Sequence, residues 1–577
     1  MWRTVQEWLE ATHSARFELC RHFSARFFDS ELVSTPGQWR VVAIGALAIL
    51  MSFSLIYTQA YYHKYLVLQE LDTPEPYRLA AVADALFLVA LAMLVIGLFT
   101  TLQWPSLFPG LRDYLALASL PIRPRDVFLA KFTALVALAG LFILATTLLP
   151  SLILPAVMAG RYAGDGLRQF QAIFVSTSLA ALFVFLTLVA VQGALLNLVP
   201  VRQFSQVSLA IQGVLLTALL CTLPLVFSIP GLQRFMNQRP DWAVWAPPAW
   251  FLGVHQVING NFEPMAVRLA RIGVAGVAGA AFAAVAVYLW SYRRHRVRVL
   301  ESPAATQKEA RAAWLGVVAD RLIPNPRELA VFVFIGKAMT RSRQHRLVLT
   351  AFAALAVALI FESFVSLAAS RSFRGFSVET PALRQAVVSA PLALSLFVLA
   401  GFRYLFRLPV ELRANWVFRI NEPGNRLAFL VAVERFLFCC AIAPVALLTL
   451  PMEIRFLGLG RGIAATILCV LPSLTLMELL LDKFDKIPFT SSYLPGRRPL
   501  IETVVIYGVA VLLYVTVLSA IVSWCIQQPD SAVLLFVMLL AVWLKMRKGR
   551  LDGREAGKIE FEELPEPAVQ TLGIERD

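Results

Sequence analysis

Charged side chains are scarce in this chain of 577 residues. Only 15% of the residues are charged, whereas 58% are hydrophobic, and the mean hydropathy is +0.69. Soluble domains carry about 25% charged residues, so this composition excludes a soluble globular protein. We therefore expect a polytopic membrane protein.

The sequence also lacks the motifs of common catalytic and metal sites. The six cysteines have neither the spacing of a zinc site nor that of a secreted disulfide framework, and the six histidines are scattered without an H-E-x-x-H string. No G-x-x-x-x-G-K-[ST] phosphate-binding loop occurs, because Gly336-Lys337 lacks the earlier glycine and the following hydroxyl. We expect no enzymatic activity, bound cofactor or metal in this chain, and any ATP hydrolysis would require a separate subunit.

Twelve apolar runs are long enough to cross a bilayer, which takes roughly 20 apolar residues in a helix. They cover residues 41–62, 79–102, 132–158, 171–198, 207–228, 272–290, 347–369, 386–402, 436–451, 463–481, 501–525 and 531–544, the last of them short. A helix satisfies its backbone hydrogen bonds internally, as the hydrocarbon region requires. The sequence therefore predicts an all-α fold with about twelve transmembrane helices.

Basic residues predict the orientation, because cytoplasmic loops collect Lys and Arg. Most of the 52 Lys and Arg residues fall on the inner side if the N-terminus is cytoplasmic. We expect both termini in the cytoplasm and the chain among the lipids of the plasma (inner) membrane. The net charge of +15 is spread through the connections between spans, so no nucleic-acid partner is expected.

A charged, proline-containing loop occurs twice. The first loop covers residues 111–131 and the second covers 412–435, with matching residues 301 to 304 positions apart. The pairs are Leu111/Leu412, Arg112/Arg413, Tyr114/Trp416, Pro121/Pro423 and Lys131/Arg435. The repeat predicts two parallel six-helix halves, residues 1–300 and 327–548, joined by a cytosolic linker (301–326) and followed by a disordered acidic tail (549–577).

Each half begins with an amphipathic segment. Between residues 14 and 33, apolar side chains recur at steps of three and four, and residues 328–339 precede a basic cluster in the second half. This pattern predicts a helix in the plane of the membrane interface. A basic flank to the following span is the alternative.

This arrangement resembles the type-2 permeases of ATP-binding-cassette (ABC) exporters. The resemblance implies that each loop is a coupling helix that docks on one of two separate cytosolic ATPase subunits, which would bind the ATP and Mg²⁺. The implied contact residues are Arg112, Tyr114, Pro121, Arg123, Arg125, Asp126, Arg413, Trp416, Arg419 and Glu422. Alternatively, these arginines obey the positive-inside rule and contact lipid head groups. The second loop departs from the pattern, with Arg419-Ile420-Asn421-Glu422 before its proline.

The predicted outer segment 229–271 is rich in tryptophan and proline. Trp242, Trp245 and Trp250 fit an ordinary aromatic belt. In the resembling family, short re-entrant helices before the sixth span form an external gate. Both interpretations stay open.

Four carboxylates lie within or beside the predicted spans, where charge is costly. Asp84 and Glu362 lie toward the outer ends of spans two and seven and are candidates for a translocation path, although head-group water is also within reach. For Glu434 we expect local pairing with Arg435 or solvation, and for Glu478 a place at the inner interface. The alternative functions are an ion-coupled secondary transporter and a lipid- or glycan-modifying membrane enzyme.

Overall fold

The computed structural model describes residues 18–24, 61–108, 124–229, 244–301, 323–369, 380–406, 415–420, 427–482, 484, 486–490, 506 and 508–552. Every regular element within these ranges is a helix, and eleven of the helices are long and apolar enough to cross a membrane. The prediction of an all-α polytopic membrane protein is therefore confirmed. Eleven of the predicted spans each fall on one of these helices, and the predicted span 41–62 lies almost wholly outside the described residues.

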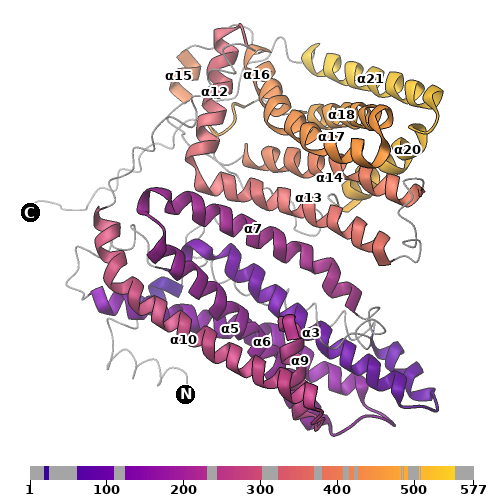
Figure 1. Cartoon of the computed structure of the whole chain (residues 1–577). Coiled ribbons are helices and arrows are strands. Elements are labelled where there is room, and N and C mark those ends of the chain that lie inside the picture. The colour runs from indigo at the N-terminus through magenta and orange to yellow at the C-terminus, as the bar shows by residue number, and fades with distance from the viewer. Residues whose placement is uncertain are drawn as a thin grey trace, which may run out of the picture. The chain divides into compact units, whose positions relative to one another are not determined.

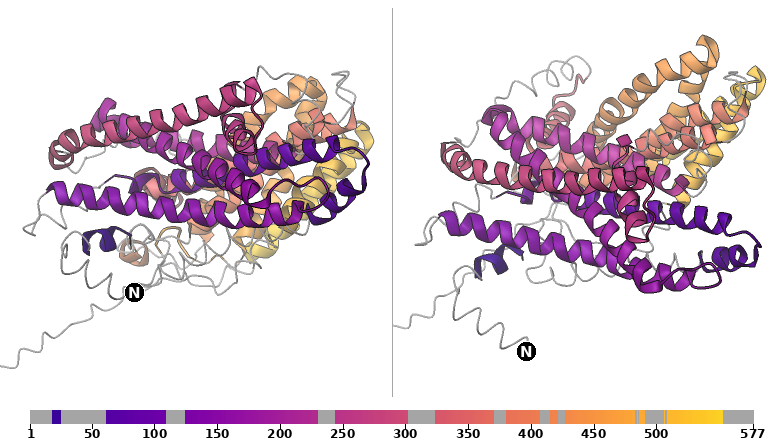
Figure 2. Two further views of the ribbon diagram at one scale, coloured as in Figure 1. Left: turned by 90° about the horizontal axis from the view of Figure 1, so that it is seen from below. Right: turned by 60° about the horizontal axis from the view of Figure 1, so that its bottom comes forward.

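The chain divides into two compact units, Met1–Ala305 and Thr306–Asp577. Figures 1 and 2 show the long helices of the first unit running roughly along one another. Besides helical turns at residues 18–24 and 61–70, the first unit contains α3 (Glu75–Leu102), η1 (Trp104–Ser106), α5 (Pro124–Met158), α6 (Gly166–Leu198), α7 (Val201–Ser228), α9 (Pro247–Ile258) and α10 (Pro264–Glu301).

Helices α3 and α6 lie at the centre of the first unit. Helix α6 packs against α3, α5, α9 and α10, and α3 packs against α5, α7 and α9. Asp165 caps the start of α6, and its side chain accepts a hydrogen bond from the backbone N–H of Leu167 at 3.2 Å. Such a cap satisfies one of the backbone donors that a helix start leaves free.

The second unit repeats this order of helices. It contains α12 (Pro326–Arg341), α13 (Arg343–Ala369), α14 (Pro381–Leu405), α15 (Asn415–Ile420), α16 (Leu427–Leu437), α17 (Ala443–Leu457), α18 (Leu459–Leu481), α20 (Leu518–Cys525) and α21 (Pro529–Asp552). The π-helical turn η7 (Phe438–Ile442) joins α16 to α17, and the π-helical segment η8 (Val511–Val517) leads into α20. Helix α21 continues past Gly549, where the acidic tail was predicted to start, and residues 553–577 lie outside the described part.

Corresponding helices pack against one another in the two units. Helix α3 contacts α5 and α7, and its counterpart α14 contacts α17 and α20. Helix α6 contacts α5 and α10, and its counterpart α18 contacts α17 and α21. The units differ before their last helix, because α9 lies there in the first unit, whereas only residues 526–528 separate α20 from α21.

Candidate functional site

The entrance to the first loop is fixed by hydrogen bonds at the end of α3. Trp104 is fully buried, and its Nε1 donates to Ser208 Oγ of α7 at 3.0 Å. Gln192 of α6 donates to the Trp104 carbonyl oxygen at 2.5 Å, and Gln212 of α7 donates to the Thr101 carbonyl oxygen at 2.8 Å. These bonds satisfy carbonyl groups that a helix end leaves free and tie the start of the loop to two other helices.

The exit of the first loop is covered by the helical turn 18–24. Leu19 and Phe23 pack in an apolar cluster with Val127 and Ala130 at the start of α5. The Nζ atom of Lys131 lies 4.8 Å from the centroid of the Phe23 ring, a cation–π contact. The amphipathic segment predicted at 14–33 thus contacts the helix that follows the first loop.

The entrance to the second loop has an aromatic anchor instead. Phe406 at the end of α14 is fully buried, and its ring centroid lies 5.8 Å from that of Phe484 and 5.6 Å from that of Phe489. The Arg403 guanidinium lies 4.7 Å from the Phe484 ring centroid. Phe406 and Trp104 are spaced along the chain like the paired loop residues, so the same position anchors both entrances with different chemistry.

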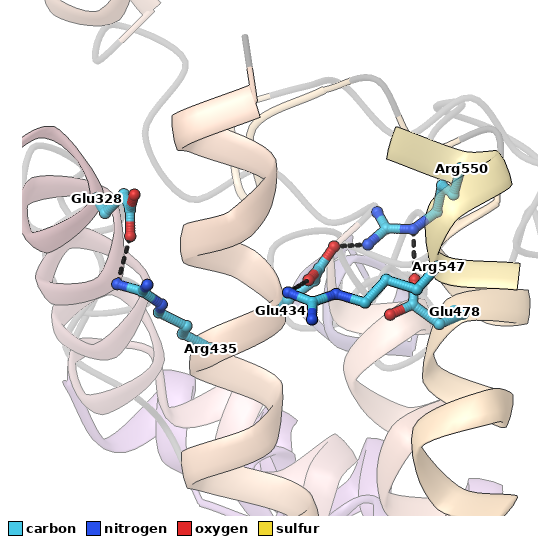
Figure 3. Close-up of polar contacts among 6 residues, drawn as sticks. All are labelled: Glu328, Glu434, Arg435, Glu478, Arg547 and Arg550. Atoms are coloured by element: carbon cyan, nitrogen blue, oxygen red, sulfur yellow. Dashed lines mark hydrogen bonds and ion pairs between the residues drawn. The ribbon is translucent and has the colours of Figure 1, made fainter. Parts of the chain in front are cut away.

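The exit of the second loop is covered by α12, which includes the predicted amphipathic segment 328–339. Phe332 of α12 packs edge-on against Phe436 of α16, with ring centroids 5.3 Å apart. Glu328 Oε2 lies 2.5 Å from Arg435 NH1 (Figure 3). Lys131 and Arg435, which the repeat pairs, therefore both contact the amphipathic segment of their own unit.

Four further charged side chains extend this contact through the second unit. Glu434 pairs with Arg550 and lies 3.6 Å from Arg547, and Arg550 Nε donates to Glu478 Oε2 at 2.5 Å (Figure 3). We call Glu328, Glu434, Arg435, Glu478, Arg547 and Arg550 the ionic belt, which links α12, α16, α18 and α21. The Arg550 side chain is only 4% exposed, so its two ion pairs are largely removed from water.

The prediction for one belt carboxylate needs correction. Glu434 pairs with Arg550 of α21 and not with its neighbour Arg435. Glu478 is 2% exposed and also pairs with Arg550, and its place at the inner interface stays a prediction. The sequence could not indicate these pairs because Arg550 lies 72 residues from Glu478 and belonged to the predicted tail.

Most of the predicted ATPase contacts fall on residues without a described side chain. Arg112, Tyr114, Pro121, Arg123, Arg413 and Glu422 lie outside the described residues. Arg125 and Asp126 lie in the first turn of α5, and Trp416 and Arg419 lie on α15. Their contact with a partner stays a prediction.

The two path candidates have different surroundings. Asp84 of α3 is 1% exposed, and its carboxylate oxygens lie 2.7 and 2.8 Å from Lys64 Nζ. The Tyr65 hydroxyl donates to the same carboxylate at 2.6 Å. Glu362 is exposed on α13 of the second unit. Sequence reasoning missed Lys64, because it follows directly on the predicted span 41–62.

Helix α9 lies within the predicted outer segment and contains buried residues. Its residue Phe251 is fully buried, whereas Trp245 just before the helix is 86% exposed, and Trp242 lies outside the described residues. Arg168 Nε donates to the Ile258 carbonyl oxygen at the end of α9 at 2.6 Å. Burial lowers the pKa of His255 to about 4, so this side chain is neutral at pH 7.

The eleven apolar helices establish the class. This chain is a multi-span membrane protein. Comparison with protein-family models, with curated proteins and with solved structures finds no match. Among the described residues, no three His, Cys, Asp or Glu side chains lie close enough together to hold a metal ion.

Proposed function

We propose that this chain is the permease subunit of an ATP-driven ABC exporter in the plasma (inner) membrane, with cytoplasmic termini. Separate ATPase subunits, two copies for one chain, bind ATP and Mg²⁺ and dock on the first and second loops. Their closure moves the helices of each unit, and substrate crosses the membrane by alternating access.

One observation carries this proposal. In each unit, an amphipathic segment packs on the helix that leaves the predicted docking loop, and a cation at the same position of the repeat makes the contact. A loop that is packed against other helices at its start and at its end transmits a movement of the ATPase to the membrane-spanning helices. A loop without these contacts would deform instead. The buried side chains of Trp104 and Phe406 fix the starts of the first and second loops.

The loop itself has the composition of a docking element. Arg112, Arg123 and Asp126 supply a charged rim, and Tyr114 supplies an aromatic anchor, the combination that dominates the energy of many protein interfaces. The aromatic and proline positions repeat together with the charges, and this joint repetition favours a protein partner.

The test is to co-purify the chain with a candidate ABC ATPase subunit. Replacing Arg112, Tyr114, Arg123 and Asp126 together with alanine should abolish complex formation or the effect of the chain on ATP turnover. The control replaces Glu263 and Arg268, which are exposed and lie on the opposite predicted side of the membrane, and should leave both unchanged. An unaltered complex with unaltered ATP turnover in the four-residue variant would overturn the docking assignment.

A second candidate is an ion-coupled secondary transporter. It is favoured by two carboxylates buried within spans, Asp84 at 1% and Glu453 at 0% exposure, because buried acids in membrane helices are typical of ion and proton pathways. Transport in liposomes driven by an ion gradient without ATP would select this candidate over the first.

A further inference from the structure

Glu453 is the exception among the buried carboxylates of the described chain. Five acidic side chains are buried there, namely Asp84, Glu328, Glu434, Glu453 and Glu478. Four of them pair with Lys or Arg. Glu453 is 0% exposed, and within the described residues its interaction is with the Thr466 hydroxyl of α18, while its Oε1 has no hydrogen-bond partner.

Within the described residues, no ion pair joins Glu453 to a cation of the neighbouring elements. Helix α17 packs against α18, α14 and η7. The charged or titratable residues on these elements and on α17 itself are Arg461, Cys469, Glu478, Arg384, Arg403, Tyr404, Cys439, Cys440 and Arg455. In the described part of the chain none of them forms an ion pair with Glu453; Cys469 is close enough to interact with it electrostatically. An ionised carboxylate here would be an unpaired charge in a dry site, which is costly.

The hydrogen bonds around Thr466 also favour the acid form. Thr466 Oγ1 lies within hydrogen-bond distance of Glu453 Oε2 and, at 3.1 Å, of the Gly462 carbonyl oxygen. A hydroxyl has one proton, so it cannot donate to both oxygens at once. If the Glu453 carboxyl carries a proton, that proton can be donated to Thr466 Oγ1 while Thr466 donates to Gly462. The acid form gives each of the two contacts a proton of its own.

We propose that Glu453 is a proton-binding site, occupied at neutral pH, that holds α17 against α18. The two backbones approach closely at this point, because a methyl group added at Gly462 would lie 2.9 Å from the Ile454 Cα atom. Loss of the proton would leave a charge between helices that have no room for water. The site lies near the end of α17 farthest from the second loop and does not depend on an ATPase partner.

A hydrophobic carbodiimide tests this directly. Dicyclohexylcarbodiimide reacts with protonated carboxyl groups in apolar surroundings: the proton moves to a carbodiimide nitrogen, the carboxyl oxygen adds to the central carbon, and the product rearranges to a stable N-acylurea. With the full-length protein in detergent at pH 7.5, mass spectrometry should find the adduct at Glu453. Glu478 is the matched control, because it is equally buried but paired with Arg550, and it should stay unmodified.

A stability measurement complements the labelling. Glu453→Gln replaces the acid by a neutral isostere and should keep the thermal unfolding midpoint at pH 7.5, whereas Glu478→Gln should lower it. Modification of Glu453 at pH 5 but not at pH 7.5 would overturn the proposal. An equal drop in the thermal unfolding midpoint of both variants would also overturn it. So would protection of Glu453 by Na⁺ but not by K⁺, since the ligand would then be a metal ion.

Discussion

At the residue scale, Arg550 is the centre of the ionic belt, because it is shared by Glu434 and Glu478. Burying charges is costly, and a buried pair is not by itself strong evidence of stability. Removing one partner is different, since it leaves the other charges buried without compensation. Replacing one belt arginine at a time therefore compares the contribution of a buried ion pair to stability with that of an exposed ion pair.

We predict that Arg550→Ala destabilises the protein strongly. Two buried carboxylates lose Arg550, and breaking a buried pair costs about 3–5 kcal/mol. The control is Arg547→Ala on the same helix, whose side chain is 38% exposed and whose pair should contribute at most about 1 kcal/mol. Thermal unfolding in detergent should show a much larger drop in midpoint for the first variant. Equal drops would mean that water screens the belt.

At the scale of elements, the packing of α9 on α10 distinguishes the first unit from the second. The contact depends on Gly253, because a Cβ there would lie 2.6 Å from Leu269 Cβ and 2.7 Å from the Ala270 backbone nitrogen. Backbone atoms cannot move aside as a flexible side chain can. Helix α9 must therefore shift if this position carries any side chain.

We predict that Gly253→Ala lowers stability by about 1–3 kcal/mol through overpacking. Gly279→Ala on α10 is the control, since no atom lies within 4 Å of its added Cβ, and alanine favours a helix over glycine by up to about 1 kcal/mol. The thermal unfolding midpoint should fall for Gly253→Ala, and it should rise or stay unchanged for Gly279→Ala. A neutral Gly253→Ala variant would contradict the close packing of α9.

At the scale of the whole molecule, hydropathy and length were sufficient to predict the helices, because the bilayer imposes both. The pattern of apolar residues likewise predicted the amphipathic segment that begins at Glu328. Side-chain partners were beyond sequence reasoning, since Arg550 was placed in the tail and Glu453 lies just past the predicted span 436–451. Pairing depends on which faces of distant helices meet, and one sequence carries no signal for that.

The two units also anchor their loops differently, which predicts unequal docking. The first loop starts at a hydrogen-bonded Trp104 and ends on a cation–π contact, whereas the second ends on the ionic belt. The loops also differ in sequence, because Leu120 directly precedes Pro121 in the first and Glu422 directly precedes Pro423 in the second.

We therefore expect alanine at Arg112, Tyr114, Arg123 and Asp126 to reduce ATP turnover of the complex more than alanine at Arg413, Trp416, Arg419 and Glu422. Both variants would be compared in the same preparation with the partner ATPase, and thermal midpoints would verify that each is folded. Neither set includes a belt residue. Equal losses would show that the loops dock equivalently despite their different anchors, and a larger loss from the second set would reverse the order argued from Trp104 and Phe406.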